Sequence, residues 1–220
     1  MFPEQHAVFL AVMLTLAGIS QLIAPVAGYF SDRSTSSWGR RLPILVGGNA
    51  VLLCMVGLLY VARTQLLGWV YLTLLFFAIT ALNIAYTGFT GLVSDMIPQE
   101  QMGTASGIMG GLTALGAVVG LVSLGFIVPV SHAYAIYSVA LIVTTPLTYW
   151  AARDPQLDPS RAKAFDWTEI GHSYYISPKS HGDFFWVFVS RTFYYMAVSV
   201  QIYILYYLKD NMPPDISDHA

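Results

Sequence analysis

Charged side chains are scarce in this chain. Asp, Glu, Lys and Arg make up 10% of its 220 residues, whereas a soluble domain has about 25%. So few charges cannot cover the surface of a protein in water, and the bilayer is therefore the expected solvent. The net charge of -2 gives no reason to expect nucleic acid as a partner. Cys54 is the only cysteine, which excludes an internal disulfide.

Charge is also absent over long stretches. Five stretches contain no Asp, Glu, Lys or Arg, and a sixth contains a single arginine. Each reaches the roughly 20 residues that a helix needs to cross the core of a bilayer. The sequence therefore predicts an all-α, integral, multi-pass membrane protein with six transmembrane helices, and leaves open which membrane holds it. The predicted spans are 7–30, 42–62, 66–93, 104–130, 133–152 and 184–208.

The basic residues predict the orientation of the spans. If the first span runs from outside to inside, the cytoplasmic segments hold seven Lys and Arg residues and the outer segments hold two. This is a positive-inside bias, and it predicts that the charged stretch 29–41, "YFSDRSTSSWGRR", is a short cytoplasmic loop. The inner residues are Arg33, Arg40, Arg41, Arg153, Arg161, Lys163 and Lys179, and the outer ones are Arg63 and Lys209.

Three stretches carry a resemblance to a known family. The pattern "GYFSDR" at 28–33, followed by "GRR" at 39–41, resembles the signature between the second and third helices of the major facilitator superfamily. With "LP" after it, and with "SDMIPQEQMGTASGIMGGLTALGAVVG" at 94–120, it looks like the sucrose-transporter and glycoside–pentoside–hexuronide symporter branch. "HGDFFWVFVSRTFYYM" at 181–196 resembles the start of the seventh helix.

This resemblance implies how the chain is organised. The six spans match helices two to seven of a twelve-helix fold, so the chain resembles a transporter fragment whose missing helices would be its partners. We expect 1–152 to be most of the N-terminal bundle, with five helices. The polar segment 153–183 is the predicted cytoplasmic inter-bundle loop, and 184–220 the first helix of the C-terminal bundle with a short tail.

The resemblance also implies a conformational latch at the cytoplasmic end of the bundle. Gly28 and Asp32 share a helix face, where Gly28 permits the close approach of another helix. We expect Asp32 and Arg33 to form the latch with Asp95 as an ion-pair partner, and Arg40 and Arg41 to act mainly in topology. The alternatives are that the arginines bind anionic headgroups and that Asp95 only caps the turn at Pro98. The predicted latch residues are Gly28, Asp32, Arg33, Arg40, Arg41 and Asp95.

Glycines recur in the span that follows Pro98. Gly103, Gly107 and Gly111 are four apart, as are Gly116 and Gly120. Small residues at this spacing let helices pack closely in lipid. The resemblance implies that this helix lies against the other half of the transporter and moves in alternating access, whereas static packing explains the glycines equally well.

Polar groups inside the spans are the candidates for a substrate cavity. Arg191 is the only charged residue in any span, which makes it a functional candidate; the alternative is that its side chain reaches back to the headgroups. The other groups are suited to a hydroxyl-rich solute or to hydrogen bonds between helices. The cavity candidates are Arg191, Gln21, Asn83, Tyr86 and Gln201.

These features favour transport of a small polar solute, with a sugar or glycoside as the expected substrate. An intramembrane enzyme would need catalytic groups within the spans, but the five histidines all lie outside them; we expect no catalytic residues, metal site or cofactor. No span contains Asp or Glu, so a coupling ion would bind to the missing helices. The remaining alternative is a scaffold or regulatory fragment that does not transport.

Overall fold

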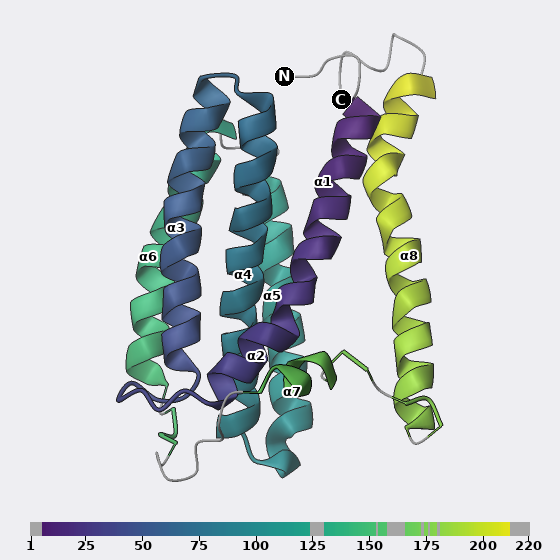
Figure 1. Ribbon diagram of the computed structural model, residues 1–220. Helices are drawn as coiled ribbons and strands as arrows, with labels where there is room; N and C mark the ends of the chain where they lie inside the picture. The colour runs from purple at the N-terminus through teal and green to yellow at the C-terminus, as the bar shows by residue number, and fades with distance from the viewer. Residues whose placement is uncertain are drawn as a thin grey trace. The chain divides into compact units, whose positions relative to one another are not determined.

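The computed structural model describes residues 6–123, 130–152, 154–157, 166–172, 174–175, 177–179 and 181–211. All regular structure in these ranges is helical (Figure 1). The elements are α1 (His6–Ser20), η1 (Gln21–Ile23), α2 (Ala24–Asp32), α3 (Leu42–Thr64), α4 (Gly68–Met96), η2 (Gln99–Gln101), α5 (Met102–Val122), α6 (Val130–Ala151), α7 (Trp167–His172) and α8 (Gly182–Asn211).

Each predicted span is helical over most of its described residues; Leu66, Leu67 and Ala152 lie just outside α4 and α6. In that part of the chain, four helical stretches are long and apolar enough to cross a membrane: Val8–Asp32, Leu42–Thr64, Gly68–Met96 and Gln99–Val122. The all-α polytopic fold is thus confirmed. α6 and α8, with 22 and 30 residues, stay predicted spans.

Prolines set several helix boundaries. The first span is interrupted by the short 3-10 turn η1, and α2 then begins with Pro25 in its first turn, where the missing proline N–H is not needed. Pro43 takes the same place in α3. At the end of α4, Ile97 is extended, as expected for the residue before a proline, here Pro98.

The chain divides into two compact units, one of residues 12–166 and one of residues 2–11 with 167–220. The boundary falls inside the predicted loop 153–183, which also contains the short helix α7. In the first unit α3 packs against α4 and α6, and α2 packs against α4 (Figure 1). Apolar side chains of α3 and α4 fill the interior, among them Leu42, Leu45, Leu52, Val56, Leu59, Ala78, Ala81 and Leu92.

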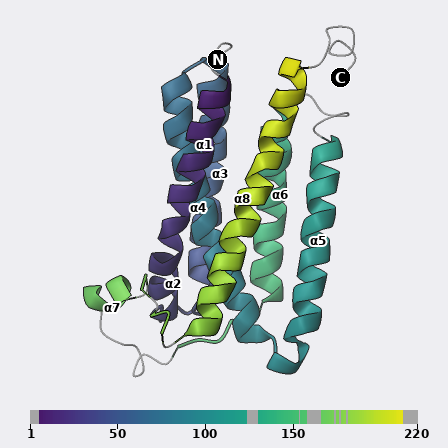
Figure 2. The ribbon, with the colours of Figure 1, turned by 90° about the vertical axis from the view of Figure 1, so that its right-hand side faces the viewer.

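α5 makes little contact with the rest of this unit. None of its residues is buried, and Figure 2 shows it standing apart from α3 and α4. At each glycine of the predicted stripe (Gly103, Gly107, Gly111, Gly116 and Gly120) an added Cβ would meet open space. The close packing predicted for these glycines is therefore not made within the part of the chain that the structure describes.

Candidate functional site

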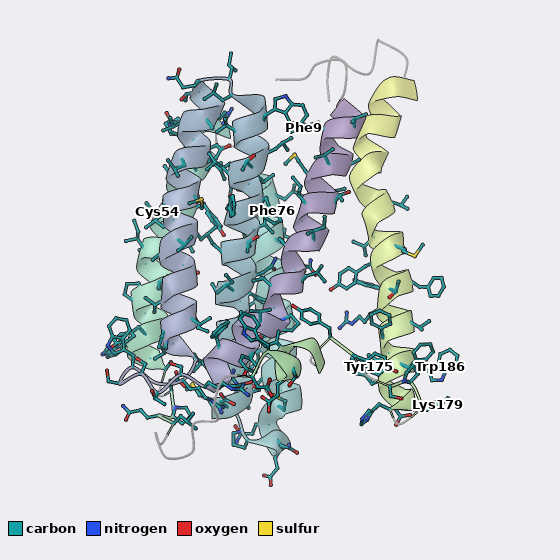
Figure 3. All side chains as sticks on the ribbon, viewed as in Figure 1. Phe9, Cys54, Phe76, Tyr175, Lys179 and Trp186 are labelled. Carbon is teal, nitrogen blue, oxygen red and sulfur yellow. The ribbon has the colours of Figure 1, made fainter. Side chains whose placement is uncertain are left out.

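The charged loop 33–41 joins α2 to α3 and lies beside the end of α4. Polar atoms gather at this end of the helices, whereas mid-helix positions such as Cys54 and Phe76 lie among carbon atoms (Figure 3). Ser31, which is fully buried, donates a hydrogen bond to the carbonyl of Arg40 at 3.4 Å. The loop is therefore folded back on the end of α2.

Asp95, in the last turn of α4, binds two arginines of this loop. Its Oδ2 accepts from Arg40 Nη2 at 2.6 Å and from Arg41 Nε at 2.8 Å. The hydrogen bond to Asp95 raises the pKa of Arg40 above its ordinary value. The Asp95 side chain is 17% exposed, so solvent screens these charges less than it screens a surface pair.

Arg41 also reaches a second carboxylate. Arg41 Nη1 lies 2.7 Å from Asp32 Oδ1, and the side chain of Arg41 is 12% exposed. A Cβ added at Gly91 would lie 2.8 Å from Arg41 Nε, so the guanidinium lies directly against the α4 backbone. We call Asp32, Arg40, Arg41 and Asp95 the ionic cluster; it joins the end of α2, the loop and the end of α4.

The partners within the cluster differ from the sequence prediction. Asp95 pairs with Arg40 and Arg41, whereas the guanidinium of Arg33 stacks 3.5 Å from the centre of the Tyr29 ring and donates to the Tyr29 carbonyl at 3.3 Å. The expectation that Arg40 and Arg41 act mainly in topology missed these contacts. Loop geometry decides which arginine faces Asp95, and sequence spacing alone does not show it.

The close helix approach predicted at Gly28 occurs elsewhere. An added Cβ at Gly28 would lie 3.7 Å from Thr87 Cγ2, an ordinary contact. At Gly48 it would lie 2.8 Å from the Ala85 nitrogen, and at Gly88 it would lie 3.0 Å from the Leu45 nitrogen. The glycines that bring backbones together are therefore those between α3 and α4.

Asp154 is a site residue that the sequence analysis did not single out. Its Oδ2 accepts the backbone N–H of Arg41 at 2.5 Å and that of Leu42 at 2.8 Å. These amides open α3 and have no acceptor within the helix. The only sequence signal was an acidic residue two positions after a predicted span. Its partners are more than 100 positions away.

The cavity candidates differ in their surroundings. Asn83 Nδ2 donates to Ser20 Oγ at 3.0 Å, which is the helix-to-helix alternative. Tyr86 lines a cavity of about 170 Å³ between α3, α4 and α6. Gln21 and Arg191 have exposed side chains, and the side chain of Gln201 lies outside the described residues.

The Tyr86 cavity has a mixed polar lining. Asn49 Nδ2 donates to Thr145 Oγ1 at 2.9 Å across it, and Thr144 and Thr148 add hydroxyl groups. Among the described residues, no group of three or more His, Cys, Asp and Glu side chains could hold a metal ion. The polar groups that line this cavity are thus hydroxyls and one amide.

Comparison with protein families identifies the family of this chain. The family model described as Major Facilitator Superfamily matches residues 2–121, which is more than half of the chain and includes every residue of the ionic cluster. The chain belongs to the major facilitator superfamily. No match was found among curated proteins or solved structures.

Membership of the major facilitator superfamily explains the apolar surface. The protein is an integral, multi-pass membrane protein of a family of transporters, so its helices meet lipid and other helices instead of water. α5 illustrates this with Leu112, Leu115 and Leu121, which are 63%, 59% and 75% exposed. Transport across a bilayer is accordingly the general function of this family member.

Proposed function

We propose that this chain moves a small polar solute across the membrane by alternating access, with the ionic cluster as its conformational latch. The observation that carries the proposal is the double contact of Arg41, which binds Asp32 and Asp95 at once. In alternating access, helical bundles rock about a central site. The cluster would hold this bundle in one of its states against a second helical bundle.

The partial burial of the Arg41–Asp95 pair favours a latch rather than a set of solvent-exposed surface charges. Exposed ion pairs contribute about 0–1 kcal/mol, whereas removing one partner of a buried pair costs about 3–5 kcal/mol. The Arg41 and Asp95 side chains are 12% and 17% exposed, which puts the pair between these limits. A contact of that strength biases an equilibrium between two states without locking it.

For the substrate, we propose a sugar or glycoside. The resemblance of stretches 28–41 and 94–120 to the sucrose and glycoside branch supports this class. So does the lining of the Tyr86 cavity, because hydroxyl and amide groups suit a polyhydroxyl solute. Arg191, as the one charge in a predicted span, is proposed to line the path of the solute. We also propose that the solute is transported together with an ion.

Uptake by proteoliposomes containing the full-length transporter tests the function. Asp95→Asn keeps the shape of the side chain but removes the charge that pairs with two arginines. We expect the rate of uptake to change by about 10-fold. This corresponds to one of the two conformational states losing about 1.4 kcal/mol of stabilisation. Glu100→Gln is the matched control, because Glu100 is an exposed carboxylate at the same end of the helices.

The outcomes separate transport from scaffolding. If the wild-type protein takes up no sugar, glycoside or other small polar solute, the scaffold alternative replaces the proposal. If uptake occurs but Asp95→Asn behaves like Glu100→Gln, the protein is a transporter whose latch lies elsewhere.

A further inference from the structure

The segment that follows α6 is tied to the α2–α3 region at two separated points. Near its start, Gln156 Nε2 donates to the carbonyl of Ser37 at 2.8 Å. At Asp166, the hydroxyl of Tyr29 donates to the carbonyl at 3.0 Å and accepts from the N–H at 2.7 Å. Since Tyr29 lies on α2 and Ser37 in the charged loop, the segment is bound to the region that carries the ionic cluster.

Asp154 connects this segment with the cluster itself. Its Oδ2 accepts the N–H groups of Arg41 and Leu42, where the α3 dipole favours a negative charge. The side chain of the same Arg41 binds Asp32 and Asp95. The backbone of one residue is thus fixed by the inter-bundle segment, while its guanidinium is fixed by the cluster.

Gly39 and Trp38 of the charged loop contact Asp154 and Tyr149, respectively. Gly39 has φ of +109°, a conformation that favours glycine, and an added Cβ there would lie 2.5 Å from Asp154 Cγ. Beside it, the ring of Trp38 packs edge-on against Tyr149 of α6 at 5.6 Å between centroids. Gly39 therefore leaves room for the Asp154 carboxylate, while Trp38 holds the loop against α6.

We propose that Asp154 is a positioning residue that aligns Arg41 for its two carboxylates. Docking of the inter-bundle segment and closure of the ionic cluster are then coupled through one residue. Only the role of this coupling in alternating access rests on the proposed function. Its physical content is that removing Asp154 weakens the Arg41–Asp95 contact, although Asp154 acts on Arg41 through the backbone.

The first measurement is amide hydrogen exchange of the purified full chain in detergent micelles. Asp154→Ala removes the acceptor of two amides, and loss of a helix cap accelerates exchange about 5-fold or more. We expect this acceleration in peptides that cover residues 37–45. Glu100→Ala, which removes an exposed carboxylate near the end of α4, leaves those peptides unchanged. Unchanged exchange in Asp154→Ala overturns the proposal.

The second measurement separates positioning from simple capping. The coupling between Arg41→Ala and Asp95→Asn is measured by a double-mutant cycle on thermal unfolding midpoints, first with Asp154 present and then with Asp154→Ala. We expect the coupling to fall by half or more when Asp154 is absent. An unchanged coupling means that Asp154 only caps α3, which contradicts the proposal.

Two further variants keep the test decisive. If Asp154→Ala does not fold, Asp154→Asn replaces it in both measurements. Its neutral amide oxygen lacks the charge that the α3 dipole favours, so we expect the same changes at a smaller size. Gly39→Ala should reproduce the fast exchange, since its Cβ takes the place of the Asp154 carboxylate. Neither measurement uses transport, so a failure of this inference is distinct from a failure of the uptake experiment.

Discussion

Arg41 joins three parts of the chain through three different groups. Its backbone N–H binds Asp154, its Nη1 binds Asp32 and its Nε binds Asp95. Only a planar guanidinium offers donors in a fixed fork that meets two carboxylates at once. A single residue thereby links α2, α4 and the segment that follows α6.

Arg41→Lys tests this role, because a lysine keeps the charge but carries all its donors on one atom, whereas Nη1 and Nε of Arg41 reach two separate carboxylates. We expect the thermal unfolding midpoint to fall by about 2–4 °C, as for a loss of about 1 kcal/mol in a chain of this size. Arg40→Lys is the matched comparison, since Arg40 makes one short contact to Asp95, which an ammonium group can replace. Equal effects of the two variants contradict a bridging role for Arg41.

The sequence predicted the members of the cluster better than their pairing. Asp32, Arg41 and Asp95 were identifiable through the resemblance to the family signature, in a chain where charge is rare. Asp154 was not identified, because it lies 113 positions from Arg41 and no periodic pattern links residues so far apart. The choice between Arg33 and Arg41 as partner of Asp95 depends on the backbone path of the loop, which sequence spacing does not encode.

At the scale of elements, α3 and α4 form the tightest contact. Gly48 and Gly88 let the two backbones approach until a methyl group no longer fits, which favours close packing in lipid. The absence of charge predicted both helices well, because it reflects the thickness of the bilayer. The position of the close contact was not predictable, because Gly47 and Gly48 look alike until the facing helix is known.

The neighbouring glycines of α3 provide a matched pair of substitutions. A Cβ at Gly48 would lie 2.8 Å from the Ala85 nitrogen, whereas one at Gly47 would meet open space. We expect Gly48→Ala to lower the unfolding free energy by about 1–3 kcal/mol through overpacking. Gly47→Ala should be neutral or slightly stabilising, because alanine favours a helix. Similar unfolding midpoints for the two variants contradict this packing.

For the whole molecule, the predicted orientation puts the ionic cluster in the cytoplasm. Asp32, the loop and Asp95 lie at one end of the first unit because α2 and α4 both end there. The all-α polytopic fold class followed from the composition and from the long uncharged stretches. The division after Asp166 did not, because the segment 153–183 has a uniform polar composition that marks no boundary within it.

Labelling of a cysteine at Ser36 tests this orientation. The native thiol is first removed by Cys54→Ser. Ser36→Cys should then react with a membrane-impermeant maleimide only in vesicles whose cytoplasmic face is exposed. The reason is that seven of the nine Lys and Arg residues outside the spans belong to that side. A cysteine at Leu66, in the opposite loop, should show the reverse pattern. Labelling of Ser36→Cys only from the outer face reverses the topology.

The hydrogen bonds between Asp154 and the start of α3 also constrain the order of folding. Contacts between α3 and α4 are local and form early, but this one closes a loop of more than 100 residues, and such closures come late. In a chain that is synthesised from its N-terminus, Arg41 reaches the membrane long before Asp154 exists. The N–H groups of Arg41 and Leu42 therefore lack the Asp154 acceptor during synthesis until α6 has been made, although the loop can already bind α2 and α4.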